Sequence, residues 1–359
     1  MAWQIVTSSR HGTSFITRRI VEALTSVLGK FMPDNSITSQ GLTKIFGHFR
    51  AVDTLNLDVN GGELFGLLGP NGAGKTTTVR MLCTLIEPTL GSATVAGLDI
   101  RKDAAAVRRS IGVVSEGVSL YKDLTIEENL KLLSTLYDIP RARAESRVQE
   151  LLEMFAFREK TKRLVGALST GWQKKAMICA ALLHDPKVLF LDEVTSGLDP
   201  QSAIALQDFT KRLCKQGVTV IWTTHYMGEP EKICDRVGIM FAGRLVQVGT
   251  PDELKHSVSE LSMVEVETPN LSATQLEKVK RKLSTMNQVC RIKYSEPKLQ
   301  VSCERKDTLA EEVAAALLDV GARIRTINTK DPTLEEAFIA LTGGEEEIDR
   351  FMETAGQAK

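Results

Sequence analysis

The sequence predicts an α/β protein with a mainly parallel sheet, followed by a smaller α+β unit. Three observations predict this class. From Glu63 onward, apolar runs of strand length alternate with helical segments, which is the pattern of a parallel sheet covered by helices. A glycine-rich loop at residues 69–76 follows the apolar run ELFGLL and opens a helix. Residues 259–343 then have the order β-α-β-β-α-β, which is typical of a ferredoxin-like domain.

The first domain, predicted over residues 36–258, contains two smaller parts. The segments SITSQGLTKIF and RAVDTLNLDVN alternate partly between apolar and polar residues and predict antiparallel β structure. Residues 117–167 are rich in helix formers with 3.6-residue spacing, as in ENLKLLSTLYDI and RVQELLEMFAF. They predict a helical subdomain within the α/β core.

The C-terminal unit is predicted as an accessory domain over residues 259–343, with a polar tail over 344–359. Its last helix is expected to begin with Asp331 as N-cap. The apolar residues that share one face of this helix are Leu334, Phe338 and Leu341. A regulatory or dimer-contact role and an inert stabilising role are equally open for this domain.

Residues 1–35 stand apart from both domains. Apolar residues recur there at helical spacing and predict an amphipathic helix that ends at Pro33. The apolar positions are Ile16, Ile20, Leu24, Val27, Leu28 and Phe31. Three interpretations stay open: a helix docked on its own domain or on a partner, a helix lying on a membrane surface, and a disordered extension.

The composition excludes several classes of protein. Lys plus Arg and Asp plus Glu both total 45, so no net field favours nucleic acid or an anionic membrane. No run approaches the ~20 apolar residues of a membrane span, and no apolar region of a signal peptide is recognisable. The six Cys show no CxxC spacing and mostly lie in apolar runs. They predict buried thiols in a reducing cytoplasm.

The loop GPNGAGKT fits the phosphate-binding pattern GxxxxGK[ST] in full. Gly69, Gly72 and Gly74 lack the Cβ atoms that would keep a phosphate chain away from the backbone. The helix begins at about Lys75, so unpaired N–H groups and the positive helix end face the anion. Lys75 is expected to reach the β- and γ-phosphates, and the Thr76 hydroxyl to ligate Mg²⁺.

Further motifs follow the loop in a fixed order. LSTGW lies at 168–172, VLFLDE at 188–193 and SGLD at 196–199, and His225 closes the apolar run VTVIWTTH. Together with the loop, these motifs resemble the ATPase domain of ATP-binding cassette (ABC) proteins over about residues 36–255. Similar C-terminal domains follow the cassette in daunorubicin-resistance-type and related multidrug exporters.

The resemblance implies roles for the polar residues that end two buried strands. Asp192 is the carboxylate on the Mg²⁺ side, and Glu193 is the base that polarises the attacking water. His225 is the switch histidine that contacts the γ-phosphate. The implied catalytic residues are therefore Lys75, Glu193 and His225. Without the surrounding motifs, a solvated acidic pair and a structural histidine would be the simpler interpretations.

The resemblance also implies the contacts to ATP. Phe46 would stack on adenine, with a half-buried strand aromatic as the alternative. Ser169 and Gly171 of the LSTGW motif would close over the γ-phosphate of a second subunit through a hydroxyl and a backbone N–H. The predicted nucleotide contacts are Phe46, Val52, Gly69, Pro70, Asn71, Gly72, Ala73, Gly74, Lys75, Thr76, Thr77, Ser169, Gly171 and Asp199.

Four positions depart from the family pattern. Thr170 and Trp172 stand where the common LSGGQ motif has Gly and Gln, and Trp172 either packs at the helix start or serves the site. Glu116 stands where the family has a Gln facing the metal and water, so it joins Thr76 and Asp192 as an implied metal ligand that adds negative charge. Val194 replaces the usual Pro, with an effect that the sequence does not define.

We therefore expect an ATP-hydrolysing subunit of an ABC exporter with ATP and Mg²⁺ as cofactors. The resemblance implies a homodimer at the cytoplasmic face of the membrane that drives separate membrane subunits and binds no nucleic acid. The resemblance implies a drug-like, lipid-like or ionic substrate. The sequence of this chain does not select among them, because the contacts to cargo lie in the membrane subunits. A non-transport ABC ATPase fits less well, since the chain has one cassette and no Cys cluster or sustained heptads. Glu116 and LSTGW favour a non-hydrolysing regulatory subunit, against which Lys75, Glu193 and His225 argue.

Overall fold

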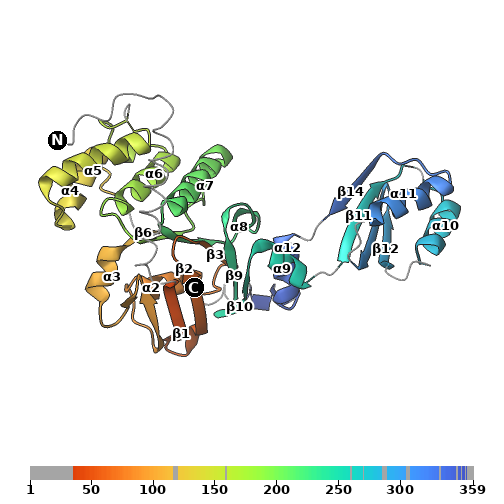
Figure 1. The fold of residues 1–359 in the computed structure, drawn as a ribbon, viewed down its shortest axis with the longest axis horizontal. Helices are drawn as coiled ribbons and strands as arrows, with labels where there is room; N and C mark the ends of the chain where they lie inside the picture. Colours follow the sequence, from red (N-terminus) through yellow and green to blue (C-terminus); the bar gives the residue numbers. More distant parts are fainter. Residues whose placement is uncertain are drawn as a thin grey trace, which may run out of the picture.

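The computed structural model of the 359-residue chain describes most positions from Asn35 onward. The described ranges are 35–115, 120–157, 160–258, 261–269, 271–284, 289–304, 308–330, 333–344, 347–348, 350–351 and 353. The helix predicted between Ile16 and Phe31 and the departure at Glu116 lie outside these ranges. Figure 1 shows a larger α/β body and a smaller α/β body, with α9 and α12 between them.

The chain begins with a four-stranded antiparallel sheet in the order β2-β1-β4-β5. Its strands are β1 (Asn35–Phe46), β2 (Phe49–Asn60), β4 (Leu90–Val95) and β5 (Leu98–Asp99). Buried and exposed residues alternate along the second half of β2, so one face of the sheet packs on the core. The predicted antiparallel β structure is therefore present at this end of the domain.

The second sheet has six strands in the order β10-β9-β3-β8-β7-β6, all parallel except the edge strand β10. The strands are β3 (Leu64–Leu68), β6 (Ile111–Val114), β7 (Val188–Asp192), β8 (Thr219–Thr224), β9 (Arg236–Phe241) and β10 (Arg244–Gly249). Every residue of β3, β7 and β8 is buried, as expected for central parallel strands. Since β8 lies between β3 and β7, the segments that follow these three strands meet at one edge of the sheet.

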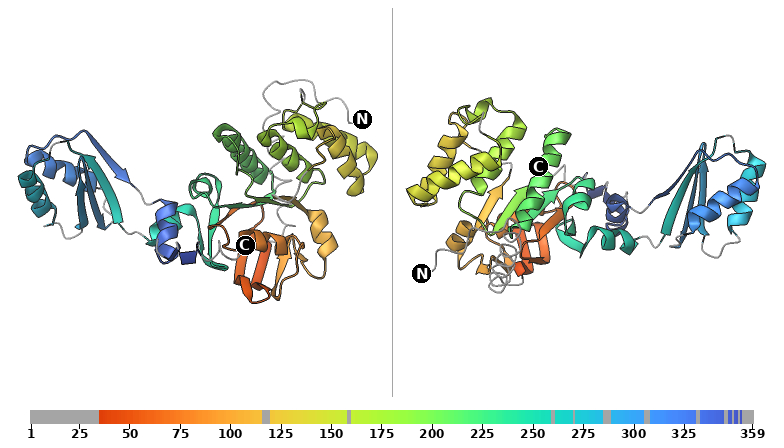
Figure 2. Two further views of the ribbon diagram at one scale, coloured as in Figure 1. Left: turned by 180° about the vertical axis from the view of Figure 1, so that it is seen from behind. Right: turned by 45° about the horizontal axis from the view of Figure 1, so that its top comes forward.

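Helices cover this sheet and extend into the predicted helical subdomain (Figures 1 and 2). Within residues 117–167, α4 and α5 pack against each other, and a Thr125–Glu128 capping box starts α4. The helices of the larger body are α2 (Lys75–Leu82), α3 (Ala104–Ser110), α4 (Ile126–Leu136), α5 (Arg141–Met154), the 3₁₀ turn η1 (Val165–Ala167), α6 (Thr170–Ala181), α7 (Pro200–Lys215), α8 (Gly228–Ile233) and α9 (Pro251–Val258).

The smaller body is an antiparallel sheet in the order β12-β13-β11-β14 with α10 and α11 on one face (Figures 1 and 2). Its elements are β11 (Leu261–Glu267), α10 (Ala273–Ser284), β12 (Val289–Ser295), β13 (Lys298–Glu304), α11 (Leu309–Asp319) and β14 (Thr326–Lys330). Val264, Leu299 and Val313 form part of a separate apolar core between the sheet and the two helices. This body therefore has a core of its own.

The last helix, α12 (Leu334–Leu341), differs from its prediction in where it starts. It begins after Thr333, whose hydroxyl accepts the N–H of Glu336 at 3.2 Å, while the Glu336 carboxylate accepts the N–H of Thr333 at 2.8 Å. The predicted N-cap, Asp331, is therefore wrong. A reciprocal capping box satisfies two orphan N–H groups, and this favours the later start.

Helix α12 also packs in a different place from the one predicted. It lies against α9 and contacts α8, so it joins the core of the larger body rather than the antiparallel sheet. Phe338 is 2 % exposed and its ring centroid lies 6.4 Å from that of Phe241. The ring of Phe351, from the predicted polar tail, lies tilted against that of Phe241, with 4.8 Å between centroids. The apolar face of α12 thus finds its partner outside the predicted domain 259–343.

In the part of the chain that the structure describes, no helix is both long enough and apolar enough to cross a bilayer. Cys83, Cys179 and Cys234 are buried free thiols, and Cys214 is a half-buried one. Burial raises the pKa of Cys179 well above its usual range. These cysteines are therefore packing residues, as their apolar sequence context predicts.

Candidate active site

The carboxyl ends of three adjacent strands carry the predicted catalytic residues. The phosphate-binding loop follows β3, Asp192 is the last residue of β7, and His225 comes directly after β8. The strand order β3-β8-β7 brings these segments together from positions far apart in the chain.

The loop needs its glycines for contacts within its own chain. Gly72 and Gly74 have φ values of +84° and +104°, in the left-handed region that glycine favours. A Cβ at Gly69 would lie 2.2 Å from the carbonyl oxygen of Met240, and one at Gly74 would lie 2.6 Å from that of Ala51. Close packing of the loop on β9 and β2 is therefore a reason for these glycines that the sequence argument did not include.

Lys75 begins α2 and is 4 % exposed. Its Nζ donates hydrogen bonds to the carbonyl oxygens of Gly69 at 2.7 Å and Pro70 at 3.0 Å, and lies 3.4 Å from Glu193 Oε1. Burial lowers the pKa of Lys75, while the carboxylates of Glu193 and Asp192 act in the opposite direction. The ammonium group thus lies beside the first N–H groups of a helix, an arrangement suited to a phosphate chain.

Asp192 is the centre of an oxygen cluster. The Thr76 hydroxyl donates to Asp192 Oδ1 at 3.3 Å, and the Thr223 hydroxyl donates to the same oxygen. Asp192 is 6 % exposed, so its carboxylate is largely shielded from water. A carboxylate and a hydroxyl at the end of a phosphate-binding loop are the oxygen donors that Mg²⁺ prefers. Thr76 and Asp192 therefore fit the predicted metal ion.

Glu193 has a strained backbone with φ of +51°. Its N–H donates to the carbonyl oxygen and hydroxyl of Thr223 at 3.1 and 3.2 Å, which holds this conformation. Glu193 Oε2 lies 3.3 Å from Nδ1 of His225, a contact without hydrogen-bond geometry. Strain held by surrounding contacts is typical of functional sites. The carboxylate thus lies between Lys75 and His225.

Three further predicted nucleotide contacts lie at the starts of α6 and α7: Ser169, Gly171 and Asp199. Ser169 is the exposed N-cap of α6, and its side chain makes no capping hydrogen bond. A Cβ at Gly171 would lie 3.2 Å from the Ser202 hydroxyl oxygen. Asp199 caps α7 by accepting the N–H of Ser202 at 2.9 Å, and hydrogen bonds from the Ser202 side chain and backbone lower the pKa of Asp199. Within the described ranges, no hydrogen bond joins Ser169 or Gly171 to the phosphate loop.

The remaining predicted contacts differ in exposure. Phe46 is 49 % exposed at the end of β1, and Lys44 Nζ lies 5.0 Å from its ring centroid. Val52 is fully buried beneath the loop, so its side chain supports Gly74 rather than facing a ligand. Asn71 is exposed at the loop tip. Ala73 is buried, and Pro70 and Thr77 are half-buried.

Two of the departures from the family pattern are packed against neighbours. The Trp172 ring lies 5.3 Å from that of Phe157, and Lys160 and Lys175 place Nζ 4.5 and 4.7 Å from its centroid. This supports the packing interpretation of Trp172. Val194 is 2 % exposed within the apolar core of the larger body.

Sequence reasoning missed polar residues that organise the site. Thr223 donates to the Asp192 carboxylate and accepts the backbone N–H of Glu193, as described above. Lys174 donates to the carbonyl oxygen of Ser196 and so joins α6 to the segment after Asp192. Thr224 and Glu229 hydrogen-bond to each other at 2.7 Å beside His225. The paired threonines that precede the histidine were the available signal, because buried hydroxyls require partners.

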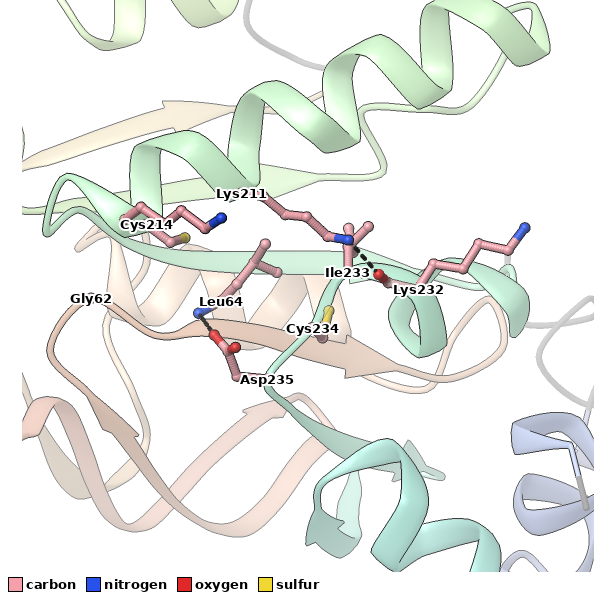
Figure 3. Close-up of a pocket in the computed structure, with 9 residues that line it drawn as sticks. Gly62, Leu64, Lys211, Cys214, Lys232, Ile233, Cys234 and Asp235 are labelled. Atoms are coloured by element: carbon pink, nitrogen blue, oxygen red, sulfur yellow. Dashed lines mark hydrogen bonds between the residues drawn. The ribbon is translucent and has the colours of Figure 1, made fainter. Parts of the chain in front are cut away.

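The pocket in Figure 3 lies at the opposite edge of the sheet, where β3 begins. It has a volume of about 410 Å³, and the N–H of Leu64 donates to Asp235 there at 2.8 Å. Lys211 donates to the carbonyl oxygen of Lys232 at 2.6 Å, near the C-terminus of α8, a favourable place for a cation. Burial raises the pKa of Cys214 to about 12, so its thiol stays protonated. This pocket is separate from the carboxyl ends of β3, β8 and β7, which form the catalytic edge of the sheet.

Known proteins resemble this chain in sequence and in fold. A family profile described as "ABC transporter" matches residues 52–196. The chain is 32% identical to the linearmycin resistance ATP-binding protein LnrL of Bacillus subtilis, over 86% of this chain and 98% of LnrL. It is 34% identical to the daunorubicin resistance ATP-binding protein DrrA2 of Streptomyces coeruleorubidus, over 90% of this chain and all of DrrA2.

Two further similarities cover about three fifths of the chain. A probable multidrug ABC transporter ATP-binding protein of Escherichia coli, YbhF, is 41% identical over 61% of this chain, which spans only 38% of YbhF. The solved structure of cbiO1 from Clostridium perfringens, part of the ABC transporter complex cbiONQ, is 27% identical with a TM-score of 0.58. That match covers 62% of this chain and 91% of cbiO1. With its full-length similarity to LnrL and DrrA2, the chain belongs to the family of ABC transporter ATP-binding proteins.

Proposed function

We propose that the chain is the ATP-hydrolysing subunit of an ABC exporter, working as a homodimer on membrane subunits at the cytoplasmic face of the membrane. The observation that carries this proposal is the meeting of Lys75, Asp192, Glu193 and His225 at three adjacent strand ends. LnrL and DrrA2 are named for resistance to linearmycin and daunorubicin. A drug-like cargo is accordingly the substrate class that we favour.

The chemistry follows from the positions of these side chains. The Lys75 ammonium binds the β- and γ-phosphates together with the N–H groups at the start of α2. Thr76 and Asp192 would hold Mg²⁺, which neutralises charge on the phosphates when bound. Glu193 orients the attacking water and polarises its O–H bond, and the His225 side chain lies next to it to contact the γ-phosphate. Phosphoryl transfer needs mainly such positioning and charge neutralisation.

A second copy of the chain completes each site in this proposal. Ser169 is exposed at the start of α6, and no hydrogen bond in the described ranges joins it to the phosphate loop of its own chain. The free N–H groups of this helix start can instead bind the γ-phosphate held by another subunit. Two identical nucleotide sites then lie between the two chains, and ATP favours the closed arrangement because it contacts both.

An apolar groove on the larger body is an observation in favour of a membrane partner. It has a volume of about 350 Å³ and lies between β6, α4 and α6. Leu85 and Tyr137 line it and remain 57 % and 40 % exposed, and Tyr121 nearby is 61 % exposed. Such a patch on a cassette suits a short helix from a membrane subunit. The solved relative cbiO1 is part of a complex, cbiONQ.

We further propose that residues 261–330 form a ferredoxin-like accessory domain. The strand order β14-β11-β13-β12, with α10 and α11 on one face, supports this assignment. The cassette would span about residues 36–258 together with α12, which packs on α9. A regulatory role and a stabilising role of the accessory domain remain equally open.

The test uses Glu193→Gln in the full chain. This change removes the base but keeps the size of the side chain and its neighbour Asp192, so hydrolysis should fall on the order of 10²–10⁴-fold. ATP binding should survive, and light scattering should then detect an ATP-stabilised dimer. Adding Ser169→Arg, which places a bulky side chain at the phosphate contact, should abolish that dimer.

The matched control is Glu231→Gln, which alters a carboxylate bound to Lys255 at 3.0 Å, away from the catalytic edge. It should leave turnover unchanged. Normal hydrolysis by Glu193→Gln would contradict its role as base. A Glu193→Gln chain that stays monomeric in saturating ATP, with and without its membrane partner, would contradict the two-chain site. Absence of turnover in the unaltered chain would favour the non-hydrolysing regulatory subunit.

A further inference from the structure

A carboxylate outside the catalytic motifs is tied to the end of β8. Glu229 lies in the first turn of α8, after His225 in the chain. Its Oε2 accepts a hydrogen bond from the Thr224 hydroxyl at 2.7 Å and lies 3.4 Å from the indole Nε1 of Trp222, which also donates to it. Thr224 and Trp222 are 1 % and 0 % exposed, so these donors are shielded from water.

The same Thr224 hydroxyl holds the turn that carries the histidine. Its Oγ1 accepts the N–H of Tyr226 at 3.0 Å. Because Thr224 and Tyr226 flank His225 in the chain, this hydrogen bond closes a short turn around the histidine. The Thr224 carbonyl oxygen accepts the N–H of Gly69, the first residue of the phosphate loop, at 3.4 Å. Glu229 therefore acts through the Thr224 hydroxyl on the backbone around His225. Thr224 in turn links this backbone to the phosphate loop.

The direction of the hydroxyl proton makes an acceptor oxygen at position 229 necessary. Oγ1 of Thr224 has one proton, and it accepts from Tyr226 while donating to Glu229. Without an acceptor at position 229, a buried hydroxyl donor is unsatisfied and the turn loses one of its fixed bonds. The ring of Tyr226 then moves with the turn, and it lies against the His225 ring at 4.2 Å between centroids.

We propose that Glu229 is a positioning residue for ATP hydrolysis: it orients the Thr224 hydroxyl, which sets the place of His225 beside Glu193. The simpler role for an acidic residue here is to complement the positive start of α8. Glu231 shares that position in the first turn, but its carboxylate binds Lys255 of α9 instead. The contacts to Thr224 and Trp222 distinguish Glu229. This inference rests on the proposed role of His225 in hydrolysis.

The experiment compares four variants of the full chain by steady-state ATPase rate and by ATP affinity. Glu229→Ala and Thr224→Val should each lower kcat by about 10- to 100-fold, the effect of one charge-assisted hydrogen bond on positioning. Both should leave the Kd for Mg–ATP within about twofold, since neither side chain is assigned a phosphate contact. Glu229→Gln retains an acceptor oxygen and should keep kcat within about threefold. Glu231→Ala, the control in the same helix turn, should retain full activity.

A double-mutant cycle separates positioning from general loss of structure. In a His225→Ala background, Glu229→Ala should lower kcat by less than about a further twofold, because the residue that Glu229 positions is already absent. An independent structural defect would instead multiply the two losses. Full activity of Glu229→Ala alongside a slow His225→Ala would overturn the positioning role but keep that of His225. Full activity of His225→Ala would overturn both. If Glu229→Ala does not fold, Thr224→Val and Thr224→Ser give the same comparison.

Discussion

Thr76 Oγ1 lies 3.3 Å from Asp192 Oδ1, although 116 positions separate the two residues. The contact joins the helix that follows β3 to the end of β7, and β8 lies between these two strands. A hydroxyl and a carboxylate that meet in this way can supply two oxygen ligands to a cation. The catalytic edge is therefore already arranged for a cation by backbone topology.

Asp192→Asn should weaken Mg²⁺ binding, because the amide keeps the size of the side chain but removes its charge. We expect the Mg²⁺ concentration for half-maximal ATPase activity to rise on the order of tenfold, about 1.4 kcal/mol. Magnesium titrations of the ATPase rate at saturating ATP measure this change. Asp252→Asn, which alters an exposed carboxylate beside Lys255 on α9, is the control and should leave the magnesium midpoint unchanged.

Lys75→Ala should reduce affinity for Mg–ATP by about 10- to 100-fold, the cost of a lost charge-assisted interaction with the phosphates. Calorimetric titration of the purified chain gives the Kd directly. Lys211→Ala removes a lysine at the opposite edge of the sheet (Figure 3) and should bind ATP normally. Equal affinities of the two variants would mean that Lys75 is structural.

Phe338→Ala should destabilise the larger body by about 3 kcal/mol, since a buried aromatic ring is replaced by a cavity. Urea unfolding followed by the fluorescence of the buried Trp222 reports on this body, because Trp222 lies in β8. Leu318→Ala, a change at a 64 % exposed position on α11, should shift the same transition by less than about 0.5 kcal/mol. An unaltered transition in Phe338→Ala would show that α12 does not stabilise the cassette.

The stability of the chain should fall below pH 7 partly through His184. Burial lowers the pKa of His184, although its Nε2–H donates to the Ile111 carbonyl oxygen at 2.8 Å and Asp185 lies nearby. The unfolded histidine takes up a proton as the pH falls through about 6.5, while the folded one resists. The free energy of unfolding therefore decreases with falling pH in the window from about 6.5 down to the lower folded pKa.

Urea midpoints between pH 7.5 and 5.5 test this effect in His184→Gln, which cannot take up the proton. The variant should lose less stability on acidification than the unaltered chain, by at most about 1.4 kcal/mol per pH unit. Parallel pH curves for the two proteins would show that His184 stays accessible to protons in the folded state. His184 also stacks on Tyr137, with 4.1 Å between ring centroids.

The sequence could predict the motifs because they are local. The run GPNGAGKT, the apolar strands and the acidic pair at Asp192 are each defined by neighbouring residues, and the family resemblance supplies their roles. The order β3-β8-β7 was not predictable from these residues, since it depends on which buried strands pair across the core. The contact between Glu193 and His225 follows from that order alone.

Side-chain surroundings explain the remaining differences. The sequence predicts that Val52 lies in a strand and contacts the nucleotide, but only the fold shows that its side chain packs beside Gly74 of the loop. Phe338 has the spacing of a core residue, and the sequence does not say which of two cores it joins. Glu229 carries no motif, so its link to Thr224 becomes visible only when α8 turns back onto β8.

Helices α9 and α12 lie side by side, and the whole antiparallel body leaves the cassette after one and returns through the other. It is therefore an insertion between consecutive cassette helices, not an appended tail. Both connections of that body therefore enter the cassette at one pair of packed helices. A displacement of the body acts on the α9–α12 pair, and α12 contacts α8, the helix that follows His225.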